Sequence, residues 1–131
     1  MMRKLDKRGV AALEFCLVAL PLFIMMFAIF DLGRYAITMQ SLRMLANAGA
    51  RAVMISYDAT NNTYTGCTGD PLSNAAKQAV APFLYSGGLT PQMAAGALNV
   101  TASQPGFTML MPIWAALNAP SASTSIPFCG A

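Results

Sequence analysis

The chain has 131 residues, of which 56% are hydrophobic and only 10% are charged, and it contains no histidine. Soluble domains usually carry about 25% charged residues. The formal net charge is +3, and the first nine residues supply it, because Arg3, Lys4, Lys7 and Arg8 outnumber Asp6 there. Basic and acidic residues balance in the rest of the chain. The positive charge therefore indicates a membrane topology and argues against a nucleic-acid partner.

An apolar run at residues 10–30 carries a single charge, Glu14. It matches the length of about 20 apolar residues that a membrane-spanning helix needs. Backbone groups in lipid must satisfy their own hydrogen bonds, so we expect the run to be helical. The basic cluster before it should stay in the cytoplasm, which leaves the C-terminus outside. A cleaved secretory signal peptide is the alternative. The run is longer than the usual apolar stretch of about 7–15 residues, and no clear cleavage site of small residues follows it.

Glu14 is the informative residue of this run. An acid near the centre of a membrane segment costs about 2–3 kcal/mol and usually has a partner or a function. Glu14 lies one turn into the segment, so one reading is that it simply reaches the headgroup region. The sharper hypothesis is a site like that of type IV prepilins. A peptidase would cut after Gly9, where glycine allows an extended chain, and would expose the amine of Val10. Glu14 would become the fifth residue, followed by Phe15, and would pair with a neighbouring subunit's amine to fix the axial register.

We expect the helix to continue past the apolar run to about Ser56, because apolar residues recur there at alternating spacings of three and four. They are Leu32, Tyr35, Met39, Leu42, Ala46, Gly49 and Val53. Gly33 and Gly49 cost about 1 kcal/mol each in a helix and therefore suggest close packing. This seam could pack against the chain's own C-terminal domain or against another subunit. One continuous helix would be about 70 Å long, and Pro21 should bend or loosen it.

Three motifs together resemble the pattern of TadE-like proteins, which are pseudopilins of the tight-adherence (Flp-type) pilus system. They lie at residues 9–15 (GVAALEF), 30–34 (FDLGR) and 46–52 (ANAGARA). The family pattern is R-x-G-x-x-x-x-E-F, an apolar run, an acid-x-Gly-Arg motif and a later Gly-Ala-Arg. The second motif corresponds to Asp31, Gly33 and Arg34, and the third contains Gly49 and Arg51. The resemblance is close over about residues 8–53 and looser afterwards.

This resemblance implies cleavage after Gly9 by a prepilin peptidase and a role as a minor pseudopilin that packs by its helix with other pilus subunits in adhesion. The implied partners are the peptidase, other pseudopilins and pilus subunits, the inner-membrane assembly platform and the membrane. The implied location is the bacterial inner membrane, crossed once, with a cytoplasmic N-terminus and a periplasmic C-terminal domain, or the pilus itself. The alternative is an uncleaved, signal-anchored structural or binding module of the periplasm.

The predicted fold class is α+β and pilin-like. We divide the chain into a basic leader (1–9), a transmembrane helix (10–30), a projecting helix (31–56) and a small periplasmic domain (57–131). Turn-forming residues predict a loop at 57–71. A second helix is predicted over 71–85, with Asp70 as its N-cap and Pro71 at its first position, although Pro82 could end it at Ala81.

The last third of the chain predicts short elements. Thr90 and Pro91 should open another turn of helix. Alternating residues predict a strand at 97–103 and an edge strand at 121–126. The apolar stretch 107–114 is compatible with a strand, a short helix or an element at the membrane surface, and it would leave an exposed patch if nothing covered it.

Cys67 and Cys129 lie in the predicted exported part, where an oxidising compartment permits a disulfide. Closing a loop of that size would stabilise the fold by about 4 kcal/mol on the chain-entropy estimate. Cys16 lies in the membrane segment and is expected to act as a small apolar residue.

Catalysis has little support in this sequence. There is no histidine, and we find no acid pair, metal-ligand cluster or glycine-rich phosphate loop. The serines have no plausible base. We therefore expect a structural protein that is not an enzyme and that needs no cofactor and no metal.

Overall fold

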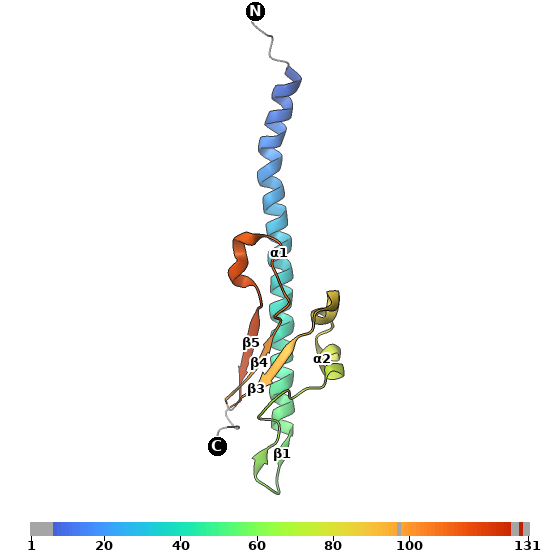
Figure 1. Cartoon of the computed structure of the whole chain (residues 1–131), viewed down its shortest axis with the longest axis vertical. Coiled ribbons are helices and arrows are strands. Elements are labelled where there is room, and N and C mark those ends of the chain that lie inside the picture. Colours follow the sequence, from blue (N-terminus) through green and yellow to red (C-terminus); the bar gives the residue numbers. More distant parts are fainter. Residues whose placement is uncertain (1–6, 97, 127–128, 130–131) are drawn as a thin grey trace, which may run out of the picture.

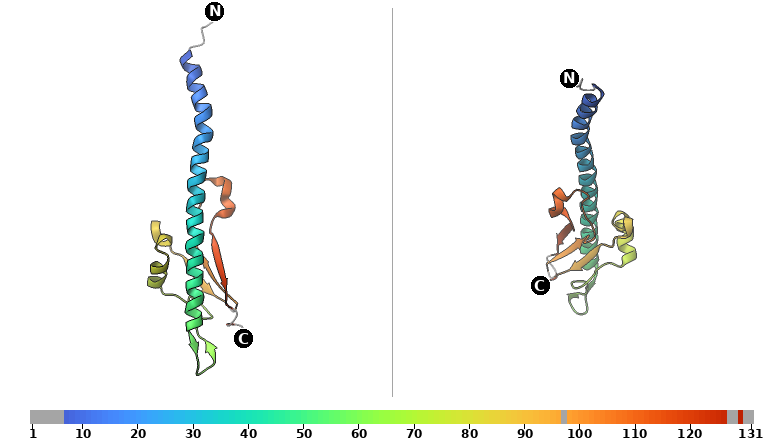
Figure 2. Two further views of the ribbon diagram at one scale, coloured as in Figure 1. Left: turned by 180° about the vertical axis from the view of Figure 1, so that it is seen from behind. Right: turned by 45° about the horizontal axis from the view of Figure 1, so that its top comes forward.

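The computed structural model describes residues 7–96, 98–126 and 129. One helix, α1 (Lys7–Ile55), has 49 residues and runs without interruption through Pro21. Among the described residues, its first half stands free, whereas its second half carries all the other elements (Figure 1, Figure 2). At 1.5 Å per residue it is about 70 Å long. The predicted α+β fold with a long N-terminal helix is confirmed.

A three-stranded antiparallel sheet covers one side of the second half of α1. Its strands are β3 (Gln92–Ala95), β4 (Asn99–Ser103) and β5 (Ser121–Ser125), in the order β3-β4-β5. Successive side chains of a strand point to opposite faces, and in β4 Val100 and Ala102 are accordingly buried against the helix. The predicted strand at 97–103 is β4, with residue 97 outside the described part, and the predicted edge strand is β5.

The core lies between this sheet and α1, and the most buried residues of both are apolar. They are Leu42, Leu45, Ala46, Ala50 and Val53 on α1, and Met93, Val100, Ala102 and Ile126 on or beside the sheet. Gly49 permits this contact, because a Cβ atom there would lie 2.7 Å from Met93 Sδ and 3.0 Å from Val100 Cγ1. From Leu42 onward, the helical seam therefore packs against the chain's own domain.

Gly33, unlike Gly49, is not closely packed against another part of the chain that the structure describes. Within the described part of the chain, nothing lies within 4 Å of a Cβ atom built at Gly33. The close packing that we predicted for both glycines is therefore correct for Gly49 and wrong for Gly33 within this chain.

The second predicted helix is shorter than expected and is split in two. α2 (Asn74–Val80) begins after Ser73, whose hydroxyl accepts a hydrogen bond from the Ala76 amide. The predicted N-cap, Asp70, instead forms an ion pair with the buried ammonium of Lys77. The residue before a proline avoids the helical region. Ala81 accordingly has φ −136° and ψ 67°, which ends α2, and the 3₁₀ helix η1 (Pro82–Gly88) follows.

The predicted helical turn after Thr90 and Pro91 is wrong, because β3 begins there. Its sequence, QMAA, has no strong strand preference of its own. Pairing with β4 and burial of Met93 at 7% exposure fix its conformation instead. Strand preference depends on such packing more than on the intrinsic backbone preference of the residues.

A small hairpin and a disulfide close the end of the fold far from the N-terminus. The hairpin consists of β1 (Tyr57–Asp58) and β2 (Thr63–Tyr64), within the stretch that was predicted as a loop. Cys67 and Cys129 form a disulfide, with 5.6 Å between their Cα atoms. This bond links the segment after the hairpin to the chain beyond β5.

Of the conformations considered for the stretch at 107–114, the short helix forms in its second part. Residues 107–109 lie outside any helix or strand, and the 3₁₀ helix η2 (Pro112–Leu117) follows. This segment projects from the side of α1 near the middle of the molecule (Figure 1).

Candidate functional site

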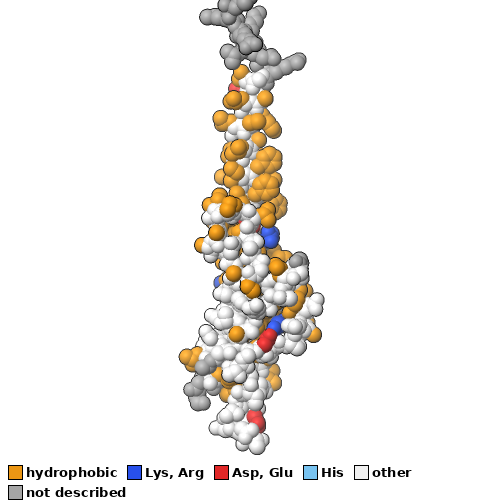
Figure 3. Space-filling model, in the orientation of Figure 1, with side chains coloured by type: hydrophobic (Ala, Val, Ile, Leu, Met, Phe, Trp, Pro, Cys, Tyr) orange, Lys and Arg blue, Asp and Glu red, His pale blue; other side chains and the backbone are white. Residues whose placement is uncertain are grey.

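The free half of α1 presents apolar side chains in every direction. Phe15, Leu17 and Ile29 are each at least 70% exposed, and Figure 3 shows hydrophobic side chains along the whole of this half. In the described part of the chain, α1 is the one helix that is long and apolar enough to cross a membrane. So large an apolar surface requires lipid or protein around it. This half of the helix is therefore the candidate anchor.

The predicted cleavage site lies at the very start of α1. The helix begins at Lys7, so Gly9 and Val10 belong to its first turns. Among the described residues, nothing lies within 4 Å of a Cβ atom built at Gly9. The extended conformation that a peptidase would need therefore requires local unwinding of α1 at Gly9 and Val10.

Glu14 projects from the free half, and its side chain is exposed. Among the described residues it has no hydrogen bond and no ion pair. Phe15 beside it is also unpacked, at 72% exposure. Neither side chain therefore contributes to the fold of the isolated chain, and any role of this pair requires another molecule.

The second motif, by contrast, is engaged within the chain. Asp31 is only 2% exposed. Its Oδ1 accepts a hydrogen bond from the Leu110 amide at 3.1 Å, and its Oδ2 accepts one from the Met111 amide at 3.0 Å. The two carboxylate oxygens thus hold two consecutive backbone amides from a distant part of the chain. We call this arrangement the Asp31 clamp.

The clamp sets the electrostatics of its carboxylate. The hydrogen bond from the Met111 amide lowers the pKa of Asp31 most. The hydrogen bond from the Leu110 amide and the positive charge of Arg34 lower this pKa further, whereas burial raises it. The result is a pKa below the ordinary value of an aspartic acid. Asp31 is therefore an anion at neutral pH, as the acceptor of two amide hydrogen bonds should be.

Arg34 supports the same contact from the next turn. Its Nη1 lies 3.7 Å from Asp31 Oδ1, and its guanidinium carbon lies 5.4 Å from the centre of the Phe107 ring. The ring of Tyr35 lies 6.4 Å from that of Phe107. Aromatic pairs and cation–ring contacts at these distances are attractive. Asp31 and Arg34 therefore fasten the segment from Phe107 to Met111 onto the helix.

The two residues of interest in the third motif face different sides of α1. Gly49 faces the sheet, whereas Arg51 is exposed. One turn earlier, the Asn47 Oδ1 accepts a hydrogen bond from the Thr124 hydroxyl at 2.8 Å. The glycine thus serves the fold, and the arginine remains on the surface of the helix.

A cleft of about 300 Å³ lies beside the clamp, between α1, η1 and the chain after β4. Arg34, Thr38, Phe83 and Phe107 are among the residues that line it. Gln104, also in its wall, is 2% exposed and donates from Nε2 to the Leu84 carbonyl at 3.0 Å. No group of three or more potential metal ligands occurs among the described residues.

Sequence reasoning found Asp31 and Arg34 but not their partners. Leu110 and Met111 contribute backbone amides, and a backbone amide leaves no signal in the sequence. Phe107 was noted as apolar, but its contacts with Tyr35 and Arg34 depend on how the chain returns to the helix.

Comparison with known proteins identifies the helical segment. A family model described as TadE-like protein matches residues 9–51. Over this segment the chain is similar to that family. The match contains the first two motifs and the third except for its last residue, and it ends within α1, so the sheet lies outside it. Comparison with curated proteins and with solved structures gave no match. The resemblance that the motifs indicated is thus confirmed over this segment, which is similar to a family associated with pili.

Proposed function

We propose that this TadE-like chain is a minor pseudopilin of the tight-adherence pilus, cleaved after Gly9 and assembled through the free half of α1. One observation carries the proposal. The family match begins at residue 9 and covers an apolar helix half whose single acid, Glu14, lacks a partner among the described residues. A helix that only anchored a domain would need no acid there, since an acid in lipid is unfavourable.

Cleavage would change this helix in two ways. Hydrolysis of the amide between Gly9 and Val10 leaves a carboxylate on the leader and a new ammonium on Val10. The leader takes with it Arg3, Lys4, Lys7 and Arg8, which are the charges that hold the N-terminus at the cytoplasmic surface. The mature chain then has equal numbers of acidic and basic side chains, and its helix can move along the membrane normal more easily.

The ammonium of one subunit and Glu14 of the next would form the assembly contact. In a medium of low dielectric, an unpaired carboxylate is costly, and a nearby opposite charge offsets that cost. Subunits displaced by one helical turn would leave both charges unpaired. The pair therefore selects one axial register, while apolar residues such as Phe15 supply the packing.

The proposed setting follows from this topology. The leader lies in the cytoplasm, residues 10–30 cross the inner membrane, and the domain from residue 57 lies in the periplasm. The prepilin peptidase and the assembly platform act on the helix from the membrane, and other pilus subunits pack against it.

The alternative is an uncleaved module that stays anchored in the membrane. One observation favours it: the projecting half of α1 is already covered by its own domain, with Leu42, Leu45 and Ala46 fully buried. That half therefore offers little apolar surface to neighbouring subunits.

The deciding experiment is the intact mass of the protein purified from membranes with and without the prepilin peptidase. We expect a chain that starts at Val10, and only when the peptidase is present. A chain that keeps its leader under both conditions would establish the anchored module instead.

Glu14 is tested next, by Glu14→Gln and Glu14→Ala, with Cys16→Ala as a matched control two positions away on the same exposed half. All three variants should insert into the membrane and be cleaved, and only the Glu14 variants should lose piliation. Normal piliation in Glu14→Gln would remove the proposed role of the charge.

A further inference from the structure

A second apolar surface lies beside the anchor. Residues 110–117, which we call the hook, comprise η2 and the two residues before it, and none of them is charged or polar (LMPIWAAL). Leu110 is 74% exposed and Ile113 is 70% exposed, and Trp114 is partly exposed. Large side chains at this exposure gain nothing from the fold. They form an exposed apolar patch that is available to bind a surface outside the chain.

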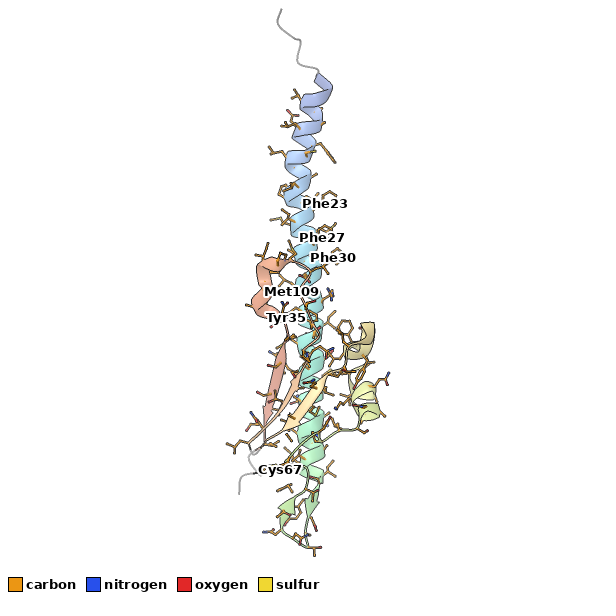
Figure 4. The ribbon with its side chains drawn as sticks, in the orientation of Figure 1. Phe23, Phe27, Phe30, Tyr35, Cys67 and Met109 are labelled. Atoms are coloured by element: carbon orange, nitrogen blue, oxygen red, sulfur yellow. A yellow bond between two sulfur atoms is a disulfide. The ribbon has the colours of Figure 1, made fainter. Side chains whose placement is uncertain are left out.

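The Asp31 clamp fixes the position of the hook along α1. Asp31 directly follows the apolar run, and it binds the amides of Leu110 and Met111, the first two residues of the hook. Figure 4 shows Met109, which precedes the hook, just beyond Phe30 along the helix. The hook is thus held where the lipid-facing part of α1 ends, and it is continuous with that surface.

We propose that the hook lies in the interfacial layer of the bilayer that α1 crosses, as a second contact between the protein and lipid. Tryptophan is enriched at this depth, because its ring is apolar and its N–H can reach water. The hook has no charge that would have to be desolvated. In the C-terminal domain, Asp58 lies on β1 and Lys77 lies on α2, where it pairs with Asp70, and both elements are farther from the anchor than the hook (Figure 1).

Such a contact would restrict the helix more than the anchor alone does. A single apolar helix can rotate about its axis and slide along the membrane normal. A second contact beside the axis fixes both movements, because rotation would carry the hook out of the interface. The hook would therefore decide the depth of Glu14 and the face of the helix that meets a neighbour. This inference requires that α1 crosses a membrane, but it does not depend on cleavage after Gly9.

The chain supplies its own probe, because Trp114 is its single tryptophan. The full chain is reconstituted in phosphatidylcholine vesicles, with bromine on the lipid acyl chains either near the headgroup or near the bilayer centre. We expect a blue-shifted emission, a strong loss of emission with shallow bromine, a smaller loss with deep bromine and little quenching by aqueous iodide.

Two outcomes would overturn the proposal. Emission typical of tryptophan in water, quenched by iodide but not by brominated lipid, would place the hook in the aqueous phase. Emission that neither quencher affects, with a dependence on the ratio of protein to lipid, would show that another copy of the protein covers the hook.

The double variant Leu110→Ser and Ile113→Ser tests whether these side chains carry the contact. The matched control is Leu98→Ser, since Leu98 is 64% exposed and lies at the opposite end of the sheet, where its carbonyl accepts from the Ile126 amide. Both proteins should form the Cys67–Cys129 disulfide and sediment with vesicles, because α1 is unchanged. The double variant should lose most of the quenching by shallow bromine and shift its emission to the red, and the control should do neither. Unchanged quenching in the double variant would contradict the proposal.

Discussion

Removing the carboxylate of Asp31 should release the hook from α1 without unfolding the protein. In Asp31→Ala the amides of Leu110 and Met111 lose their acceptors, which now lie 3.1 Å and 3.0 Å away. A hydrogen bond to a charged acceptor corresponds to a factor of about ten or more in an equilibrium constant. Two such bonds predict about 100-fold faster hydrogen exchange at these amides. Asp31→Asn keeps one acceptor oxygen and should give about a tenfold increase.

The measurement is residue-resolved hydrogen exchange on the full chain in detergent. Asp58→Ala is the control, because Asp58 also accepts two hydrogen bonds, from the Thr60 amide and the Asn61 side chain, but lies in the hairpin at the far end. It should leave exchange at Leu110 and Met111 unchanged. If Asp31→Ala leaves the protection of both amides intact, the clamp does not hold the hook and the reasoning fails.

Acid should have the same effect as the substitution. The pKa of Asp31 is lowered, first by the Met111 hydrogen bond, so the charged form contributes fully above the ordinary value of about 3.9. That contribution is lost only as the pH falls through the lower pKa of the folded state. Exchange corrected for its intrinsic pH dependence should therefore stay flat down to about pH 4 and rise below it, except in Asp31→Ala.

Two further predictions concern the fold. Gly33→Ala should stabilise the protein by about 1 kcal/mol, because the site is open and alanine favours helix. Gly49→Ala should destabilise it by about 1 kcal/mol, because the added Cβ would meet Met93 and Val100. Equal effects of the two substitutions in thermal denaturation would contradict this reasoning. Cys129→Ser should lower the free energy of unfolding by up to about 4 kcal/mol, because the bond links residues 62 apart. Cys16→Ser should change it little, and denaturant titrations in which both variants behave alike would exclude a stabilising disulfide.

The sequence allowed α1 to be predicted almost to its ends. Its signals are local: an uninterrupted apolar run, then side chains spaced three and four apart, and such patterns specify a helix wherever they occur. The alternation in Asn99–Ser103 specified a strand for the same reason. By contrast, β3 depends on burial of Met93 between β4 and α1, which no local pattern encodes.

For each contact of the candidate site, the sequence allowed one partner to be predicted but not the other. Asp31 was singled out by its motif, but its acceptor role depends on amides 79 and 80 residues away. The cap of α2 shows the same limit. Asp70 and Ser73 are both good caps, and the choice fell to Ser73 because Asp70 pairs with Lys77.

The division of α1 into a covered and a bare half has a consequence for how such a subunit could leave the membrane. Because the domain covers the second half of α1, the bare half of a subunit assembled as we propose would serve two environments in turn, lipid before assembly and protein after it. Extraction would then be an exchange of one apolar surrounding for another, with little net exposure of the helix to water. The free-energy change of assembly would then come mainly from groups that are solvated differently in lipid and in protein. On this half of the helix, that group is the carboxylate of Glu14.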